Sequence, residues 1–155
     1  MQEIRTEDLI YFAGFFDGEG CVSCQEPYRN PRPYLIFANN NKNVLEQAQQ
    51  LFGGKIYQQS KWRCWQLFIM KAEEVEKTAT ALLPFIRIKK KQLQLAILFA
   101  RVVQLHKVGP NPMLQEHMDL RIKFSLALKI ENQKRGVMEA CGVNTNIPIR
   151  SRSSA

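Results

Sequence analysis

Residues 9–20, with the sequence LIYFAGFFDGEG, constrain the fold more than any other segment of this chain. The segment is apolar, has the small residues Ala13 and Gly14 at its middle, and ends in Asp17 and Glu19, each followed by a glycine. Such a run predicts an α-helix, although Gly14 lowers the helix propensity by about 1 kcal/mol. The close approach of a second helix, which small residues permit, would offset that cost.

The helical period divides this segment into two faces. One face would enter the core of the protein and carries Leu9, Phe12, Phe15 and Phe16. The opposite face is expected to press against another helix and carries Ile10, Ala13, Gly14 and Asp17. The segment therefore predicts a helix with its own core on one side and a partner helix on the other.

The acidic end of the predicted helix points to a metal ion. Thr6 is a suitable N-cap at the start of the helix, whereas Gly18 and Gly20 would end it. Asp17 and Glu19 then lie where the helix dipole is already negative, and each costs up to about 1 kcal/mol there. Carboxylates held among the exposed carbonyls of a helix end suit a divalent cation. The same residues also fit an ordinary helix stop, because Asp-Gly and Glu-Gly are common turn pairs.

Charge is distributed unevenly along the chain, whose 155 residues are enough for one domain. We assign that domain to residues 1–142 and expect a flexible tail at residues 143–155. The net charge is +8, and residues 77–115 contain basic side chains but no acidic one. A segregated excess of Lys and Arg favours a polyanionic partner, most commonly nucleic acid.

The sequence also bounds the compartment. No stretch reaches the ~18 apolar residues of a membrane span, and the acidic residues near the start argue against a secretory signal. Cys21 and Cys24 have CxxC spacing, but a second such pair and clustered histidines are missing, so the sequence does not support a zinc site. We expect reduced thiols in an intracellular protein, either in a bacterial or archaeal cytoplasm or in an organelle.

Periodicity and turn residues predict the remaining elements. Strands are expected at residues 21–27, 34–40, 55–59 and 62–70. Further helices are expected at residues 44–52, 72–83, 90–106 and 113–134, the first of them capped by Asn43. The order helix, two strands, helix, two strands, helices predicts an α+β fold with one antiparallel four-stranded sheet and helices on one face.

The alternation of side chains assigns the two faces of that sheet. The face toward the helices would carry Val22, Ile56, Trp65, Leu67 and Ile69. The free face and its turns would offer groups that read base edges or hold phosphates, namely Ser23, Gln25, Arg29, Arg32, Tyr34, Asn40, Lys55, Tyr57, Gln59, Lys61, Cys64 and Gln66. Half-exposed strands are polar in most proteins, so this DNA-binding assignment depends on the segregated basic charge.

Two strings of residues resemble a known family. FAGFFDGEG, at residues 12–20, is similar to the signature of the LAGLIDADG homing endonucleases. LLPFIRIKKKQ, at residues 82–92, resembles a pattern of the single-motif members of that family. The resemblance extends over about residues 6–107. It implies an αββαββα unit with a saddle-shaped sheet, to which this chain adds a C-terminal helix.

The resemblance implies a site-specific DNA endonuclease that makes metal-dependent double-strand breaks at a long, near-palindromic target. Because the chain carries one copy of the motif, it implies a homodimer on double-stranded DNA. Glu19 of each subunit, with the carbonyl of Gly18, would bind Mg²⁺ or another divalent cation. Lys89 would be the catalytic basic residue, although Lys90 or Lys91 could take its place, and Asn41 would organise water.

The alternative function is a non-catalytic nucleic-acid binder on the same fold, either an RNA-splicing maturase or a transcription regulator. The acidic position separates the two, because binders often lose it and this chain retains Glu19.

Overall fold

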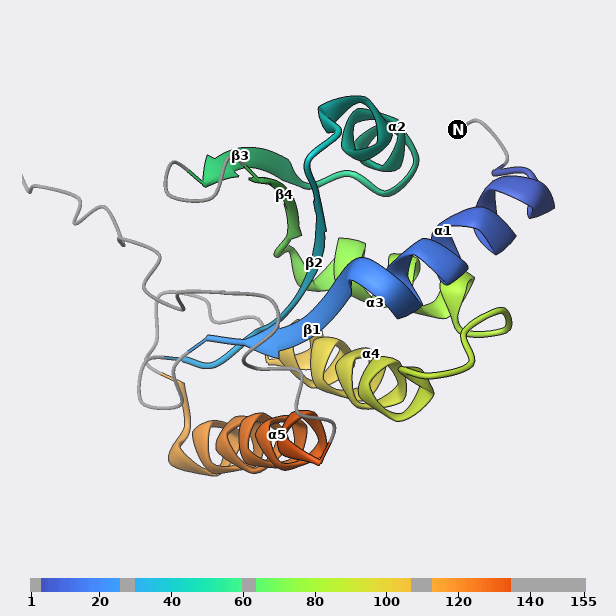
Figure 1. Ribbon diagram of the computed structural model, residues 1–155. Coiled ribbons are helices and arrows are strands. Elements are labelled where there is room, and N and C mark those ends of the chain that lie inside the picture. Colours follow the sequence, from blue (N-terminus) through green and yellow to red (C-terminus); the bar gives the residue numbers. More distant parts are fainter. Residues whose placement is uncertain (1–3, 26–29, 60–63, 107–112, 135–155) are drawn as a thin grey trace, which may run out of the picture.

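The computed structural model describes residues 4–25, 30–59, 64–106 and 113–134, in an α+β arrangement (Figure 1). The helices are α1 (Thr6–Glu19), α2 (Lys42–Phe52), α3 (Ala72–Leu82), α4 (Lys90–Leu105) and α5 (Gln115–Gln133). The strands are β1 (Gly20–Cys24), β2 (Pro33–Asn39), β3 (Lys55–Gln59) and β4 (Cys64–Ile69). Arg29, Lys61 and the predicted tail lie outside the described residues.

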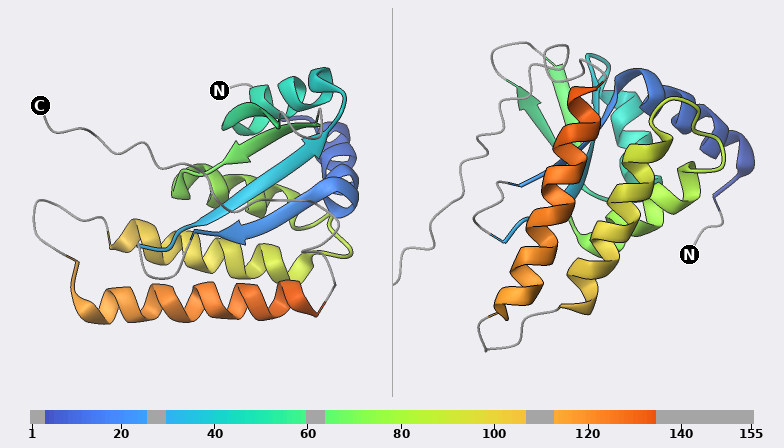
Figure 2. Two further views of the ribbon diagram at one scale, coloured as in Figure 1. Left: turned by 60° about the vertical axis from the view of Figure 1, so that its left-hand side comes forward. Right: turned by 90° about the horizontal axis from the view of Figure 1, so that it is seen from below.

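The strands form one antiparallel sheet in the order β1-β2-β4-β3, which confirms the predicted αββαββα unit. Helices α1 to α4 lie on one side of this sheet, and α5 lies beside α4 along the β1 edge (Figures 1 and 2). Among the described helices, none is both long and apolar enough to cross a membrane.

Helices α3 and α4 begin at the predicted residues, whereas α1, α2 and α5 begin one or two residues away from the predicted starts. Helix α1 begins at Thr6, so its N-cap position is Arg5 and not Thr6. Helix α2 begins at Lys42, because the side-chain oxygen of Asn41 accepts a hydrogen bond of 3.0 Å from the backbone N–H of Asn43. The predicted cap Asn43 is therefore wrong, and Asn41 satisfies one of the free N–H groups at the helix start.

The core fills the space between the sheet and the helices. Phe12 and Phe16 of α1 meet Phe37 of β2, and the ring centroids of Phe16 and Phe37 are 4.9 Å apart. Of the predicted core residues of the sheet, Val22, Leu67 and Ile69 belong to this cluster, and Ile56 and Trp65 are partly buried and pack against it. Gly20 has a negative φ, and its backbone lies against the Phe16 ring, which a Cβ atom would overlap. Its small size therefore lets the chain pass from α1 into β1.

The other face of the sheet departs from the expected polar surface. Tyr34, Ile36 and Phe68 form a second apolar cluster there, and each is at most 7% exposed. Gln66, on the same face, is also buried. The prediction of an open polar face was therefore wrong at Tyr34 and Gln66, because alternation along a strand assigns a face but does not show whether that face is covered.

Candidate functional site

The carboxylate of Asp17 connects the end of α1 to the start of α4. Its Oδ2 accepts hydrogen bonds from the backbone N–H groups of Arg87, at 2.7 Å, and Ile88, at 3.1 Å. Its Oδ1 accepts a third, of 3.0 Å, from the N–H of Lys89. These N–H groups immediately precede α4, where a helix dipole favours negative charge. Asp17 is therefore stabilised within its own chain and does not carry the cost that the sequence predicted.

Lys89 makes the reciprocal contact. Its side chain is buried, and Nζ donates hydrogen bonds to the backbone oxygens of Phe16, at 3.0 Å, and Asp17, at 2.5 Å. A cation at the C-terminal carbonyls of α1 complements the negative end of that helix dipole. The structure thus places Lys89 at the same helix end as Glu19, with its ammonium group bonded to the helix. Lys90 and Lys91 are exposed on the first turn of α4.

Glu19 is the last residue of α1, and its side chain is exposed. It makes no side-chain hydrogen bond or ion pair with the described part of the chain. Gly18 beside it is also exposed and faces open space. Within the described ranges, no three His, Cys, Asp or Glu side chains gather into a metal-binding group. One chain therefore offers a single carboxylate and backbone oxygens, fewer ligands than a divalent cation takes.

The predicted partner-facing side of α1 needs a correction. Ala13 is fully buried in the chain's own core, and Asp17 bonds to the segment before α4, so neither is free for a second helix. Ile10 is 54% exposed, and Gly14 and Gly18 have nothing within 4 Å of the position a Cβ would take. These three residues lie four apart and form one exposed stripe, which we call the glycine stripe.

Asn41 lies at the same end of the sheet as α1, because Gly20 pairs with Phe37 and β2 ends two residues later at Asn39. Its oxygen caps α2, and its backbone N–H donates to the side chain of Asn39, at 2.8 Å. Asn40 beside it is exposed. The structure therefore shows a capping role for Asn41, and its proposed role in catalysis stays a prediction.

The strand register places most of the predicted DNA-binding residues on one face. Pairing aligns Ser23 with Tyr34, Tyr57 with Gln66 and Gln59 with Cys64, on the side opposite the helix-facing core. Lys55 and Tyr57 are exposed on this face, as is Arg32 at its end. The N–H of Gln25 bonds to the oxygen of Arg32, at 3.1 Å, and extends the β1–β2 pairing past both strands.

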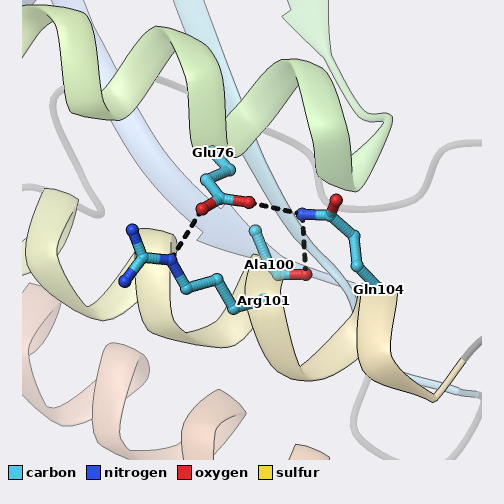
Figure 3. Close-up of polar contacts among 4 residues, drawn as sticks. All are labelled: Glu76, Ala100, Arg101 and Gln104. Atoms are coloured by element: carbon cyan, nitrogen blue, oxygen red, sulfur yellow. Dashed lines mark hydrogen bonds and ion pairs between the residues drawn. The ribbon is translucent and has the colours of Figure 1, made fainter.

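A polar contact that the sequence did not predict holds α4 against α3 (Figure 3). The carboxylate of Glu76 accepts hydrogen bonds from Arg101 Nε, at 2.6 Å, and Gln104 Nε2, at 2.7 Å. These two bonds hold the pKa of Glu76 below its ordinary value. Lys89 directly precedes α4. The bonds of Glu76 therefore help to fix the position of α4, and so the position of Lys89 at the end of α1. An acid on one predicted helix and bases on the next were the available signal, but their pairing depends on how the helices cross.

A second unpredicted residue is Arg121, a fully buried arginine in the middle of α5. Its guanidinium donates to the backbone oxygens of Val103, at 3.2 Å, and His106, at 3.0 Å, and to the side chain of Asn30. These bonds join α5 to the end of α4 and to the segment before β2. In the sequence Arg121 is one of several basic residues of a mixed helix, so nothing marks it as buried.

Comparison with known proteins identifies the family. The family model described as LAGLIDADG endonuclease matches residues 12–96, more than half of the chain, including Glu19 and Lys89. The chain belongs to the LAGLIDADG endonuclease family. A comparison with curated protein sequences gives no match.

Solved LAGLIDADG-type structures share the fold. The archaeal intron-encoded homing endonuclease I-Vdi141I, in complex with DNA, is 20% identical with a TM-score of 0.66, over 81% of this chain and 84% of that chain. The homing endonuclease I-TnaI is 14% identical with a TM-score of 0.63, over 90% and 99%. The group I intron-encoded homing endonuclease I-CeuI, also bound to DNA, is 18% identical with a TM-score of 0.60, over 87% and 69%.

Proposed function

We propose that this LAGLIDADG endonuclease cleaves both strands of duplex DNA at a specific, near-palindromic site, as a homodimer that depends on Mg²⁺ or another divalent cation. The observation that carries the proposal is the exposed carboxylate of Glu19 at the end of α1. Asp17, the other acid of the motif, is used within the chain. Glu19 is left as the carboxylate that can meet a ligand.

The glycine stripe supports the homodimer. Ile10, Gly14 and Gly18 present a narrow surface without side-chain bulk at two of its three positions, so two α1 helices can approach closely. A twofold axis along this stripe would bring the two Glu19 carboxylates toward one another. Tyr11, which is 55% exposed on the same helix, would flank the contact.

The donor set at the end of α1 fits a hard divalent cation. Glu19 and the carbonyl of Gly18 are oxygen ligands, which Mg²⁺ prefers, and phosphate oxygens of bound DNA would complete the shell. The cation, when bound, would supply charge stabilisation at phosphorus and a nucleophilic water. Lys89 would hold the carbonyl end of α1 in place and add positive charge beside the scissile phosphate. Asn41 would orient water through its free amide group.

The sheet supplies the DNA-binding surface in this proposal. Lys55 and Tyr57 are exposed on the face opposite the helices, with Arg32 exposed at its end. A twisted antiparallel ribbon of this kind can enter a major groove, where polar side chains read base edges. Ser23, Gln25, Gln59 and Cys64 are half-exposed on the same side, whereas buried Tyr34 and Gln66 would act by supporting them.

Cleavage by a Glu19→Gln variant tests the proposal. We expect this variant to lose cleavage in Mg²⁺ while it retains DNA affinity, because the change removes the ligand charge at an exposed position. Glu7→Gln is the matched control, since Glu7 is an exposed acid at the opposite end of the same helix. Normal cleavage by Glu19→Gln would show that the metal site lies elsewhere. A wild-type chain that binds DNA and never cuts it would instead support the non-catalytic binder.

A further inference from the structure

A cavity lined by both charged and apolar side chains lies at the other end of α4, between α4, α5 and the segment that leads into β2. Its volume is about 660 Å³. Arg32, Lys71 and Arg121 supply positive charge to its walls, against the single acid Glu73. Lys89 precedes α4 and His106 follows it, so the 16 residues of this helix separate the cavity from the Glu19 end by about 24 Å. The cavity is therefore distinct from the proposed cleavage site.

Arg121 is a buried cation without an anionic partner among the described residues. Arg121 is 1% exposed, and its hydrogen-bond partners are two backbone oxygens and the amide oxygen of Asn30. Its Nε–H is buried and has no hydrogen-bond acceptor within the described ranges. A buried charge is stable only when it is paired, and a buried donor without an acceptor is costly. The carbonyls at the end of α4 offset only part of the charge.

The neighbours of Arg121 add to this imbalance. Burial lowers the pKa of Arg121, and the nearby positive charge of Arg32 lowers it further. His106, which lines the same cavity, has a buried Nδ1 that also lacks a hydrogen-bond partner in the part of the chain that the structure describes. Its ring stacks on His117 with centroids 3.6 Å apart and planes within 5°, so the imidazole is held in a fixed orientation. Two orphan polar atoms and two guanidinium groups therefore border one cavity.

We propose that this cavity binds a phosphate group, held by Arg121 and Arg32 with His106 as a further hydrogen-bonding group. Guanidinium groups bind phosphate oxygens with strong, directed hydrogen bonds, and a phosphate offers enough acceptors for both arginines. This phosphate group would belong either to the backbone of bound DNA or to a free phosphate ester. The exposed position of Arg32 at the end of the DNA-facing strands gives either source access.

Titration of the full-length, ¹⁵N-labelled chain with inorganic phosphate tests the site, with sodium chloride at equal ionic strength as the reference. We expect phosphate, but not chloride, to shift the Arg121 Nε–H resonance and the His106 imidazole signals. Arg32→Gln should weaken phosphate binding about tenfold, because it removes a charge-assisted hydrogen bond and leaves buried Arg121 in place. Arg101→Gln is the matched control and should bind phosphate within twofold of wild type, since Arg101 does not line the cavity and Gln104, which does, keeps its own hydrogen bond to Glu76.

An Arg121 signal that phosphate leaves unmoved, or equal phosphate affinity of Arg32→Gln and Arg101→Gln, would overturn the proposal. Adding a non-target duplex to the phosphate-bound protein identifies the source. Displacement of phosphate with retention of the Arg121 shift would assign the site to the DNA backbone, whereas simultaneous binding would assign it to a free phosphate ester. Glu19→Gln should bind phosphate as the wild type does. Failure of the cleavage proposal and failure of the phosphate-site proposal can therefore be told apart.

Discussion

At the scale of single residues, Asp17 and Lys89 hold two helix ends together, because each side chain bonds to the backbone at the other residue's helix end. The carboxylate accepts three N–H groups before α4, and the ammonium donates to two carbonyls at the end of α1. The helix dipoles therefore stabilise both charges, the negative one at the start of α4 and the positive one at the end of α1. These reciprocal hydrogen bonds fix the end of α1, and with it the position of Glu19, and they leave the Glu19 side chain exposed.

The contribution of the Asp17 hydrogen bonds to the free energy of unfolding can be measured. Asp17→Asn removes the charge and turns one acceptor into a donor that faces N–H groups. We expect the free energy of unfolding to fall by about 2 kcal/mol, in line with hydrogen bonds to charged groups. Urea unfolding of the variant and of the control Glu7→Gln measures this. A fall no larger than that of the control would show that the three hydrogen bonds contribute little.

Glu76 makes a contribution to folding stability that depends on pH. Because Arg101 and Gln104 lower its pKa in the folded state, its contribution is fully present above its ordinary pKa of 4.5. The contribution is lost as the pH falls through the lowered folded-state value. Wild type should therefore be more stable than Glu76→Gln near neutral pH, by about 1 kcal/mol or less, and the difference should vanish in acid. Thermal unfolding of both proteins across this range checks the sign, which a difference that grew in acid would contradict.

At the scale of elements, the helices, the strands and the two faces of the sheet could be predicted from the sequence, because each depends on local periodicity, whereas the pairing register comes from the structure. The exact partners could not. Asp17 bonds to N–H groups about seventy positions away, which no local pattern shows. Ala13 is one helical position from Gly14, yet it is buried while Gly14 is open, because the side that α1 turns to the sheet is set by the packing of Phe12 and Phe16.

The glycine stripe predicts a sensitive dimer contact. Gly14→Leu adds a side chain into open space in the single chain, so we expect the monomer fold to persist. The same side chain should separate two α1 helices and weaken dimerisation at least tenfold. Sedimentation of this variant, beside Gln50→Leu at an exposed position of α2, measures the effect. Unchanged association of Gly14→Leu would place the dimer contact on another surface.

At the scale of the whole molecule, an excess of basic charge is combined with a four-stranded antiparallel sheet. The net charge of +8 and the exposed Lys55 and Arg32 predict DNA binding that depends on phosphate contacts. The logarithm of the affinity should fall linearly with the logarithm of salt concentration, and Lys55→Gln should reduce that slope by about one contact. Fluorescence anisotropy over a salt series measures it, with Lys123→Gln on exposed α5 as the control. A flat salt response would contradict this mode of binding.

We propose that the chain cuts DNA at a site built around Glu19. Incubating the wild-type protein with a plasmid library of randomised target sites, with Mg²⁺ and with EDTA, tests it most directly. We expect double-strand breaks at one recovered, near-palindromic sequence in Mg²⁺ and none in EDTA. Binding to a recovered sequence without any cleavage in Mg²⁺ would contradict it.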